Sequence, residues 1–261
     1  MARAPDTEPV IISAPFGNYV GFDGATSTLG TFTVQKRAGR LWRILKTVRY
    51  YKRLGAWVNR IGLRNPGIEW LEKRVRSGKA DLSSSLVSVH GFSDEQWWAL
   101  LQRADRLGAR GLELNMSCPN VGEVNWPERL FERAAMIQTP VVVKLPPVRF
   151  ERLADEVIAS GIRAVHCSNT LPVRGGGMSG KPLLPVSLAC VDEVRARAER
   201  AGVSDFVIVG GGGITTPEDV DAYANAGANR FALGSVLMHP RYLRGPGPMR
   251  GVVERAKERA S

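Results

Sequence analysis

Cysteine is scarce in this chain of 261 residues, which has only Cys118, Cys167 and Cys190. No two of them form a CxxC pair, so the sequence indicates neither a disulfide framework nor an iron–sulfur or zinc site. The sequence also lacks any apolar run of eighteen residues or more, and residues 1–10 lack the apolar core of a signal peptide. We therefore expect a soluble, cytoplasmic protein whose thiols are free.

Acidic residues are missing from one segment. Residues 36–53 contain eight Lys or Arg and no Asp or Glu, and they contribute much of the formal net charge of +11. Within them Leu41, Ile44, Leu45 and Val48 recur at the spacing of one helix face, while the basic residues fall mainly on the other face. The pattern predicts a basic amphipathic helix. This helix either packs its apolar stripe on the rest of the protein or docks on an anionic membrane or a partner protein.

Eight short apolar runs alternate with segments of helical pattern along the chain. The runs span residues 10–14, 27–34, 84–89, 111–115, 141–144, 164–167, 206–209 and 230–234. The helical segments span residues 94–107, 128–137, 150–160, 187–201 and 217–226. This alternation predicts an α/β fold, a (β/α)8 TIM barrel forming one domain over residues 1–261, with 36–53 as an insertion. A doubly wound open sheet is the alternative.

Polar side chains stand where the predicted strands end, and in a (β/α)8 barrel these ends meet at one mouth. Lys144 ends the apolar run 141–144, and a buried ammonium must be paired or used. Cys118 follows the run 111–115 in the hexapeptide Asn-Met-Ser-Cys-Pro-Asn, between two side-chain amides. This thiol is either a small apolar residue in a tight turn or a group with a chemical function.

Glycines follow the last two predicted strands. Residues 210–213 are four glycines, and Gly234 precedes Ser235 after the eighth run. Because glycine lets backbone N–H groups approach an anion closely, and the segment after 210–213 opens a helix, these two loops indicate a phosphate site. A third glycine segment, residues 175–180, would let the backbone lie against a flat ring.

Taken together, the motifs resemble the dihydroorotate dehydrogenase family. The matching segments are ISAPFGN at 12–18, NRIGLRNPG at 59–67, LELNMSCPNV at 112–121, VVVKLPP at 141–147, SNT at 168–170, GGGMSGKPL at 175–183, IVGGGGI at 208–214 and LGS at 233–235. They follow the family's order over nearly the whole chain. The resemblance implies an FMN-dependent barrel that oxidises dihydroorotate to orotate in pyrimidine biosynthesis, and a homodimer.

The resemblance also implies roles for individual residues. Cys118 would remove a proton from C5 of dihydroorotate while C6 gives a hydride to the flavin, and Lys144 would stabilise negative charge on the reduced flavin. The substrate would be bound by Asn65, Asn115, Asn120, Asn169 and Thr170. FMN would be held by Ser13, Lys36, Asn115, Lys144, Gly180, Gly212, Gly213, Gly234 and Ser235.

The chain departs from the family's pattern after the second predicted strand. Cys118 at the base position is typical of the soluble class, whereas the membrane-bound class has Ser there. Lys36 matches the soluble class's lysine only with a shift of one residue, and the basic stretch 36–53 replaces a Pro-rich lid. The electron acceptor therefore stays open between fumarate, NAD through a partner subunit, and a quinone.

Other functions are compatible with parts of the pattern. A tRNA dihydrouridine synthase also has its cysteine in an N-x-x-C-P context, which residues 115–119 satisfy, and the positive charge suits RNA. Related flavin-dependent pyrimidine or enoate reductases are a further enzymatic alternative. A degenerate flavin-binding barrel without activity is the non-enzymatic alternative, because a fold does not guarantee activity.

Overall fold

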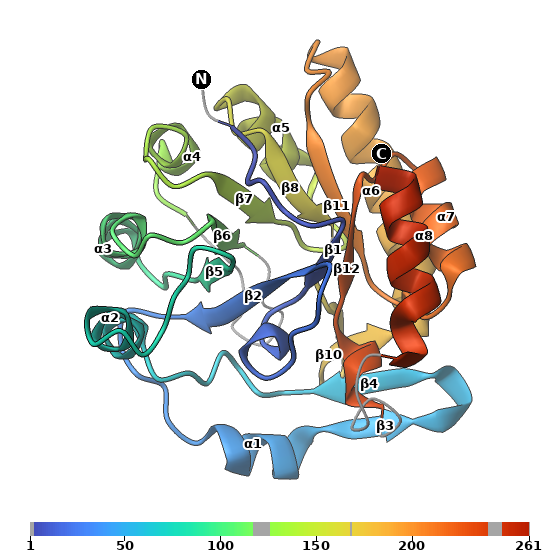
Figure 1. Ribbon diagram of the computed structural model, residues 1–261, viewed down its shortest axis with the longest axis horizontal. Coiled ribbons are helices and arrows are strands. Elements are labelled where there is room, and N and C mark those ends of the chain that lie inside the picture. Colours follow the sequence, from blue (N-terminus) through green and yellow to red (C-terminus); the bar gives the residue numbers. More distant parts are fainter. Residues whose placement is uncertain (1–2, 117–125, 168, 240–246, 261) are drawn as a thin grey trace.

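Eight parallel strands close into a barrel in the computed structural model, which describes residues 3–116, 126–167, 169–239 and 247–260 (Figure 1). They are β1 (Val10–Ile12), β2 (Ala25–Phe32), β5 (Leu86–Val89), β6 (Gly111–Asn115), β7 (Val141–Lys144), β8 (Ala164–Cys167), β11 (Val207–Gly211) and β12 (Arg230–Leu233). Sequential strands pair around the ring, and β12 closes it against β1. The predicted TIM barrel is confirmed, and the open-sheet alternative is wrong.

Helices cover the outside of this barrel (Figure 1). They are α2 (Ile68–Arg76), α3 (Asp94–Asp105), α4 (Leu130–Ala134), α5 (Glu151–Ala159), α6 (Leu184–Arg200), α7 (Pro217–Asn225) and α8 (Arg250–Ala260). The five predicted helices are confirmed to within a few residues, apart from the shorter α4, whereas α2 and α8 were not predicted. Caps define two of the starts: Ser93 accepts a bond from the Gln96 N–H, and Thr216 forms a capping box with Asp219.

The alternation of side chains along the strands fills the barrel. Inward-facing Ile11, Leu86, Val142, Ala164, Val209 and Ala232 form an apolar layer inside it. Side chains alternate between the two faces of a strand, so residues two positions further along face inward again, nearer the carboxyl ends. Those residues are Ser13, Ser88, Lys144, His166, Gly211 and Gly234. The inside of the barrel thus changes from an apolar layer to a largely polar mouth over two residues of each strand.

A second, antiparallel sheet lies beside the mouth. It contains β3 (Arg49–Tyr51), β4 (Ala56–Asn59), β10 (Gly176–Gly180) and β9 (Leu171–Val173), in that order. The predicted helix over 36–53 is therefore too long, because only α1 (Arg40–Thr47) is α-helical, and a 3-10 turn, η2 (Lys52–Leu54), follows β3. Val48 is extended, and the aromatic pair Tyr50 and Tyr51 continues as a strand against β4.

None of the helices in the described ranges has the length and apolar character that crossing a membrane requires. The cysteines within those ranges, Cys167 and Cys190, are buried and unbridged.

Candidate active site

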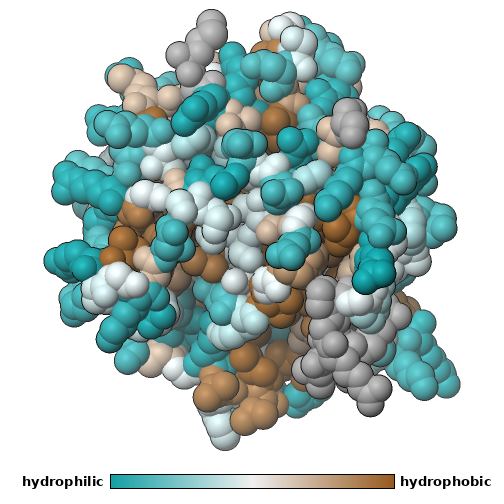
Figure 2. Space-filling view, viewed as in Figure 1, coloured by the Kyte–Doolittle hydropathy of each residue, from teal (hydrophilic) through white to brown (hydrophobic). Residues whose placement is uncertain are grey.

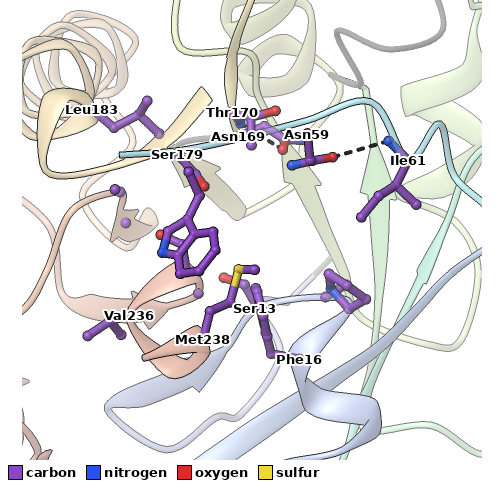
Figure 3. A pocket seen from close by; sticks show the side chains of 18 of the residues that line it. Ser13, Phe16, Asn59, Ile61, Asn169, Thr170, Ser179, Leu183, Val236 and Met238 are labelled. Atoms are coloured by element: carbon purple, nitrogen blue, oxygen red, sulfur yellow. Dashed lines mark hydrogen bonds between the residues drawn. The ribbon is translucent and has the colours of Figure 1, made fainter. Parts of the chain in front are cut away.

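A cavity of about 630 Å³ lies at the mouth of the barrel, within the usual size range of small-molecule sites. Its walls come from both sheets. Figure 3 shows Ser13 and Phe16, which follow β1, on one side, Asn169 and Thr170, which follow β8, on another, and Ser179 of β10 between. The short 3-10 helix η4 (Ser235–Met238) contributes Val236 and Met238. The cavity thus joins the polar mouth to the small sheet.

A buried charged cluster lies at the floor of the cavity. Lys144 at the end of β7 is 4% exposed, Glu113 of β6 is fully buried, and His166 of β8 places its Nδ1 2.8 Å from the Glu113 Oε2. Burial by itself would raise the pKa of Glu113, but the Lys144 ammonium and the His166 hydrogen bond outweigh it and hold that pKa at about 2. Burial and the same ammonium lower the pKa of His166. The cluster therefore holds an ionised carboxylate, an ammonium and a neutral imidazole at pH 7.

Amide side chains stand next to this cluster in a fixed orientation. Asn115 donates from Nδ2 to the Thr31 Oγ1 at 2.9 Å, and Asn169 donates to the Asn115 Oδ1 at 3.1 Å. The Asn169 Oδ1 in turn accepts from the Thr170 N–H at 2.8 Å. The backbone carbonyl of Asn115 lies 2.7 Å from the His90 Nδ1. These bonds decide which way each amide faces, and so pre-organise donors and acceptors at the cavity wall.

The glycine loops after β11 and β12 form another wall. Gly212 and Gly213 have φ values of +119° and +83°, which side chains rarely adopt, and a Cβ on Gly212 would lie 2.7 Å from the Ser187 Oγ. Gly234 and Ser235 also line the cavity, at the start of η4, which follows the neighbouring strand β12. Backbone is therefore exposed to the cavity where a phosphate would need N–H donors.

The start of α7 contributes less to anion binding than its sequence predicted. The Asp219 Oδ2 accepts from the backbone N–H groups of Thr215 and Thr216 at 2.8 and 3.0 Å, and its carboxylate pairs with Lys181 at 2.7 Å. These N–H groups are already bonded to a carboxylate inside the protein. A phosphate bound in this cavity would therefore meet the glycine loops and η4 rather than free N–H groups of Thr215 and Thr216 at the start of α7.

Most of the predicted site residues come together at this cavity. Those that line it are Ser13, Asn115, Lys144, Asn169, Thr170, Gly180, Gly212, Gly213, Gly234 and Ser235. Cys118 and Asn120 lie outside the described residues.

Two predicted residues are placed elsewhere. Asn65 is buried, and its amide is used within its own loop: Oδ1 accepts from the N–H groups of Thr33 and Gly67, and Nδ2 donates to the Thr33 Oγ1 and the Leu63 carbonyl. Lys36 is exposed and does not line the cavity. The roles that the resemblance implied for both therefore have no support in this geometry.

Several residues in and beside the cavity were not predicted. The strand AVHC places His166 inward, directly opposite Lys144 in the pairing of β7 with β8, and the alternation of side chains could have revealed this. Glu113 is likewise an inward acid within the run 111–115. Trp57 and Arg40 also line the cavity, and they carried no local signal because only the small sheet and α1 bring them there.

Comparison with known proteins identifies the family. A family model described as dihydroorotate dehydrogenase matches residues 18–243. The chain belongs to the dihydroorotate dehydrogenase family. This family consists of FMN-dependent oxidoreductases. The match therefore favours an oxidoreductase of this family over the tRNA dihydrouridine synthase interpretation and over the degenerate flavin-binding barrel without activity.

Individual relatives include two types of dihydroorotate dehydrogenase. The chain is 29% identical over 240 residues to the catalytic subunit of dihydroorotate dehydrogenase B (NAD(+)) from Alkaliphilus oremlandii, covering 82% of this chain and 78% of that protein. It is 32% identical over 214 residues to dihydroorotate dehydrogenase A (fumarate) from Lactobacillus helveticus, covering 68% and 66%. A crystal structure of ligand-free dihydroorotate dehydrogenase from Eimeria tenella shares the fold, with a TM-score of 0.73 at 19% identity, covering 96% and 82%.

The lining of the cavity is compatible with the flavin of this family. Gly180 and Gly212 line it with bare backbone, and packing requires glycine at both positions, because a Cβ would lie 2.3 Å from the Gly55 carbonyl oxygen or 2.7 Å from the Ser187 Oγ. Lys144 adds a cation to the lining of the cavity, which would suit the polar edge of the flavin. The donor set thus contains backbone for the phosphate, glycine for the flat ring and an ammonium for its polar edge.

Proposed function

We propose that this chain catalyses the FMN-dependent oxidation of dihydroorotate to orotate. The observation that carries the proposal is the arrangement of the buried Lys144 beside the bonded amides of Asn115 and Asn169, at the floor of a cavity with glycine walls. The family match supports the same reaction. When bound, FMN supplies the acceptor for the hydride that leaves C6 of the substrate.

The amides suit the substrate's ring. Dihydroorotate presents ring N–H groups, carbonyls and a carboxylate, which need both donors and acceptors. Asn115 and Asn169 are held by Thr31 and Thr170, so they bind without first losing rotational freedom. We assign the orientation of the ring to this pair, with Asn120 as a further ligand from the segment after β6.

Lys144 has an electrostatic role in the proposal. Lys144 lines the cavity and Glu113 does not, so the carboxylate compensates the charge of Lys144 without itself lining the cavity. A pre-organised cation stabilises negative charge that develops at the flavin's edge during the reaction. His166 stays neutral beside them, and a neutral imidazole adds no competing charge.

Cys118 is proposed as the base that takes the C5 proton. It stands three positions after Asn115, the last residue of β6, and so follows the barrel's mouth in sequence. A thiol has an ordinary pKa of about 8.5, and only the thiolate accepts the proton. We therefore expect the rate of substrate oxidation to rise with pH through this range.

Anaerobic bleaching of the bound flavin by dihydroorotate tests the function. We expect rapid bleaching in the wild type and a rate at least about 100-fold lower in Cys118→Ala, as general-base catalysis contributes about that much or more. Cys190→Ala, which removes a buried thiol from α6, is the matched control and should bleach at the wild-type rate. A flavin-loaded wild type that stays oxidised between pH 7 and about pH 9 would refute the assignment.

The electron acceptor and the assembly are further proposals. The relatives include a NAD(+) type with a named catalytic subunit and a fumarate type. Reoxidation of the dihydroorotate-reduced protein by fumarate, by NAD with a partner subunit, or by a soluble quinone distinguishes these routes. Sedimentation velocity tests the homodimer that the family resemblance implies.

A further inference from the structure

The segment of residues 36–54, which we call the basic lip, exposes apolar side chains at the cavity's edge. Leu41, Trp42 and Leu45 of α1 are 77%, 67% and 76% exposed, and Leu54 is 58% exposed. Figure 2 shows apolar residues gathered at the lower edge of the molecule, where Figure 1 places α1. Isolated exposed apolar residues are ordinary, but a cluster on one short helix indicates a binding surface.

The same segment carries unbalanced positive charge. Residues 36–53 contain eight Lys or Arg, and no acid occurs between Asp23 and Glu69. Throughout the described part of the chain, no ion pair involves any of these eight residues. The charge of the lip is therefore available to an external anionic surface.

The basic lip is anchored to the small sheet, where β3 pairs with β4, so its exposure is a built feature. Arg49 donates to the carbonyls of Lys46 and Val48 at 3.1 and 2.8 Å and so bonds the last turn of α1. Thr47 bonds back to the Arg43 carbonyl and accepts from the N–H of Arg60, just beyond β4. These bonds hold α1 in place.

Anchored in this way, α1 presents two different faces. Ile44 and Val48 line the cavity, whereas Leu41, Trp42 and Leu45 point away from the core. The outward face is the one that has no cover within the described structure.

We propose that the basic lip docks on an anionic lipid surface. A helix that mixes Trp and Leu with Lys and Arg suits the membrane interface, where the apolar side chains enter the headgroup region and the cations meet lipid charge. Docking would place the cavity's edge, formed by Ile44, Val48 and Tyr50, beside the lipid. The proposal rests on this surface and is independent of the proposed reaction.

Cosedimentation with vesicles tests the docking. Vesicles of phosphatidylcholine with phosphatidylglycerol at low ionic strength should bind the wild type, vesicles of phosphatidylcholine alone should bind it weakly, and 0.5 M salt should release it. Lys46→Gln, Lys52→Gln and Arg53→Gln combined should weaken binding about 100-fold, because each cation near such a surface contributes about fivefold. None of these three side chains lines the cavity.

A second variant tests the apolar part. Leu41→Gln, Trp42→Gln and Leu45→Gln combined should abolish measurable binding while retaining the net charge. Thermal unfolding of each variant at the wild-type temperature, together with unchanged flavin bleaching, shows that fold and chemistry remain. The docking and the proposed reaction are thereby tested separately.

The matched control removes three cations from the other end of the barrel. Arg76, Lys79 and Arg106 are exposed and stand in or after the last turns of α2 and α3, before the amino ends of β5 and β6. Their combined change to Gln should leave vesicle binding within about twofold of the wild type. Failure of the wild type to bind anionic vesicles, or an equal loss in this control, overturns the proposal. If the surface binds a protein partner instead, the wild type would fail to bind anionic vesicles.

Discussion

Replacing Glu113 with Gln would expose how much the buried charge cluster contributes to folding. The pKa of this carboxyl falls from 4.5 to about 2 in the folded protein, and each pKa unit corresponds to about 1.4 kcal/mol. The ionised carboxylate therefore contributes about 3 kcal/mol to the free energy of unfolding at pH 7. The Gln side chain retains the shape but leaves the Lys144 ammonium without its compensating charge, a change that usually costs about 3–5 kcal/mol. We expect a loss of about 3 kcal/mol.

The pH dependence follows from the direction of the pKa shift. A carboxyl whose pKa is lower in the folded state contributes its full stability above the unfolded pKa and loses that contribution as pH falls through the folded pKa. The difference between wild type and Glu113→Gln should therefore be complete above about pH 5.5 and near 2 kcal/mol at pH 3.5. It should approach zero near pH 2.

Urea unfolding at pH 7 and pH 3.5 measures this difference. With an m value of about 3 kcal/mol/M, the midpoint at pH 7 should fall by about 1 M. Glu132→Gln on the exposed face of α4 is the control and should change stability by less than about 0.5 kcal/mol. Glu113→Gln with Lys144→Met should recover part of the loss, since neither charge is then buried alone. Equal midpoints at pH 7, or a difference that grows toward pH 3.5, would refute the reasoning.

Two further substitutions test other parts of the site. Asn65→Ala removes an amide that makes four hydrogen bonds within its loop, so the free energy of unfolding should fall by about 3 kcal/mol. The KM of the folded fraction for dihydroorotate should stay within about twofold of the wild type. A large change in KM without a loss of stability would support a substrate role for Asn65. Gly212→Ala places a methyl group 2.7 Å from the Ser187 Oγ on a residue whose φ is +119°, so this loop must shift. The flavin content of the purified protein should therefore fall at least about tenfold. A normal flavin content would contradict the assignment of this loop to the flavin.

The strands were predictable because their signal is local. An apolar run such as 141–144 is buried on both faces, which favours a parallel barrel strand, and all eight runs form strands of the barrel. The helix predicted over 36–53 was too long because Arg49, Tyr50 and Tyr51 pair with β4, a tertiary preference that overrides the helical spacing. The strand β10 was predicted as a glycine loop because its pairing with β4 is likewise a tertiary contact that the local sequence does not show.

The positions of two kinds of cavity residue were predictable from the sequence: residues that end a strand, and glycines in the loops after strands. Lys144 at the end of β7 and the glycines after β11 needed only their neighbours in sequence to point to the mouth. The pairing of Glu113 with His166 joins residues 53 positions apart, and only closure of the barrel brings them within 2.8 Å. Asn65 shows the opposite case, because its loop uses the amide that the family resemblance had given to the substrate.

The sequence by itself determined the barrel, its polar mouth and the glycine walls, because strand alternation and the freedom of glycine act over a few residues. Only the tertiary structure decided which charges meet, how deeply they are buried and therefore which pKa values shift, since these depend on side chains far apart in the chain. It also decided that the apolar stripe of α1 is divided, with Ile44 and Val48 at the cavity and Leu41 and Leu45 outside. Helical spacing places these residues on one face, but only packing against the small sheet determines which of them is covered.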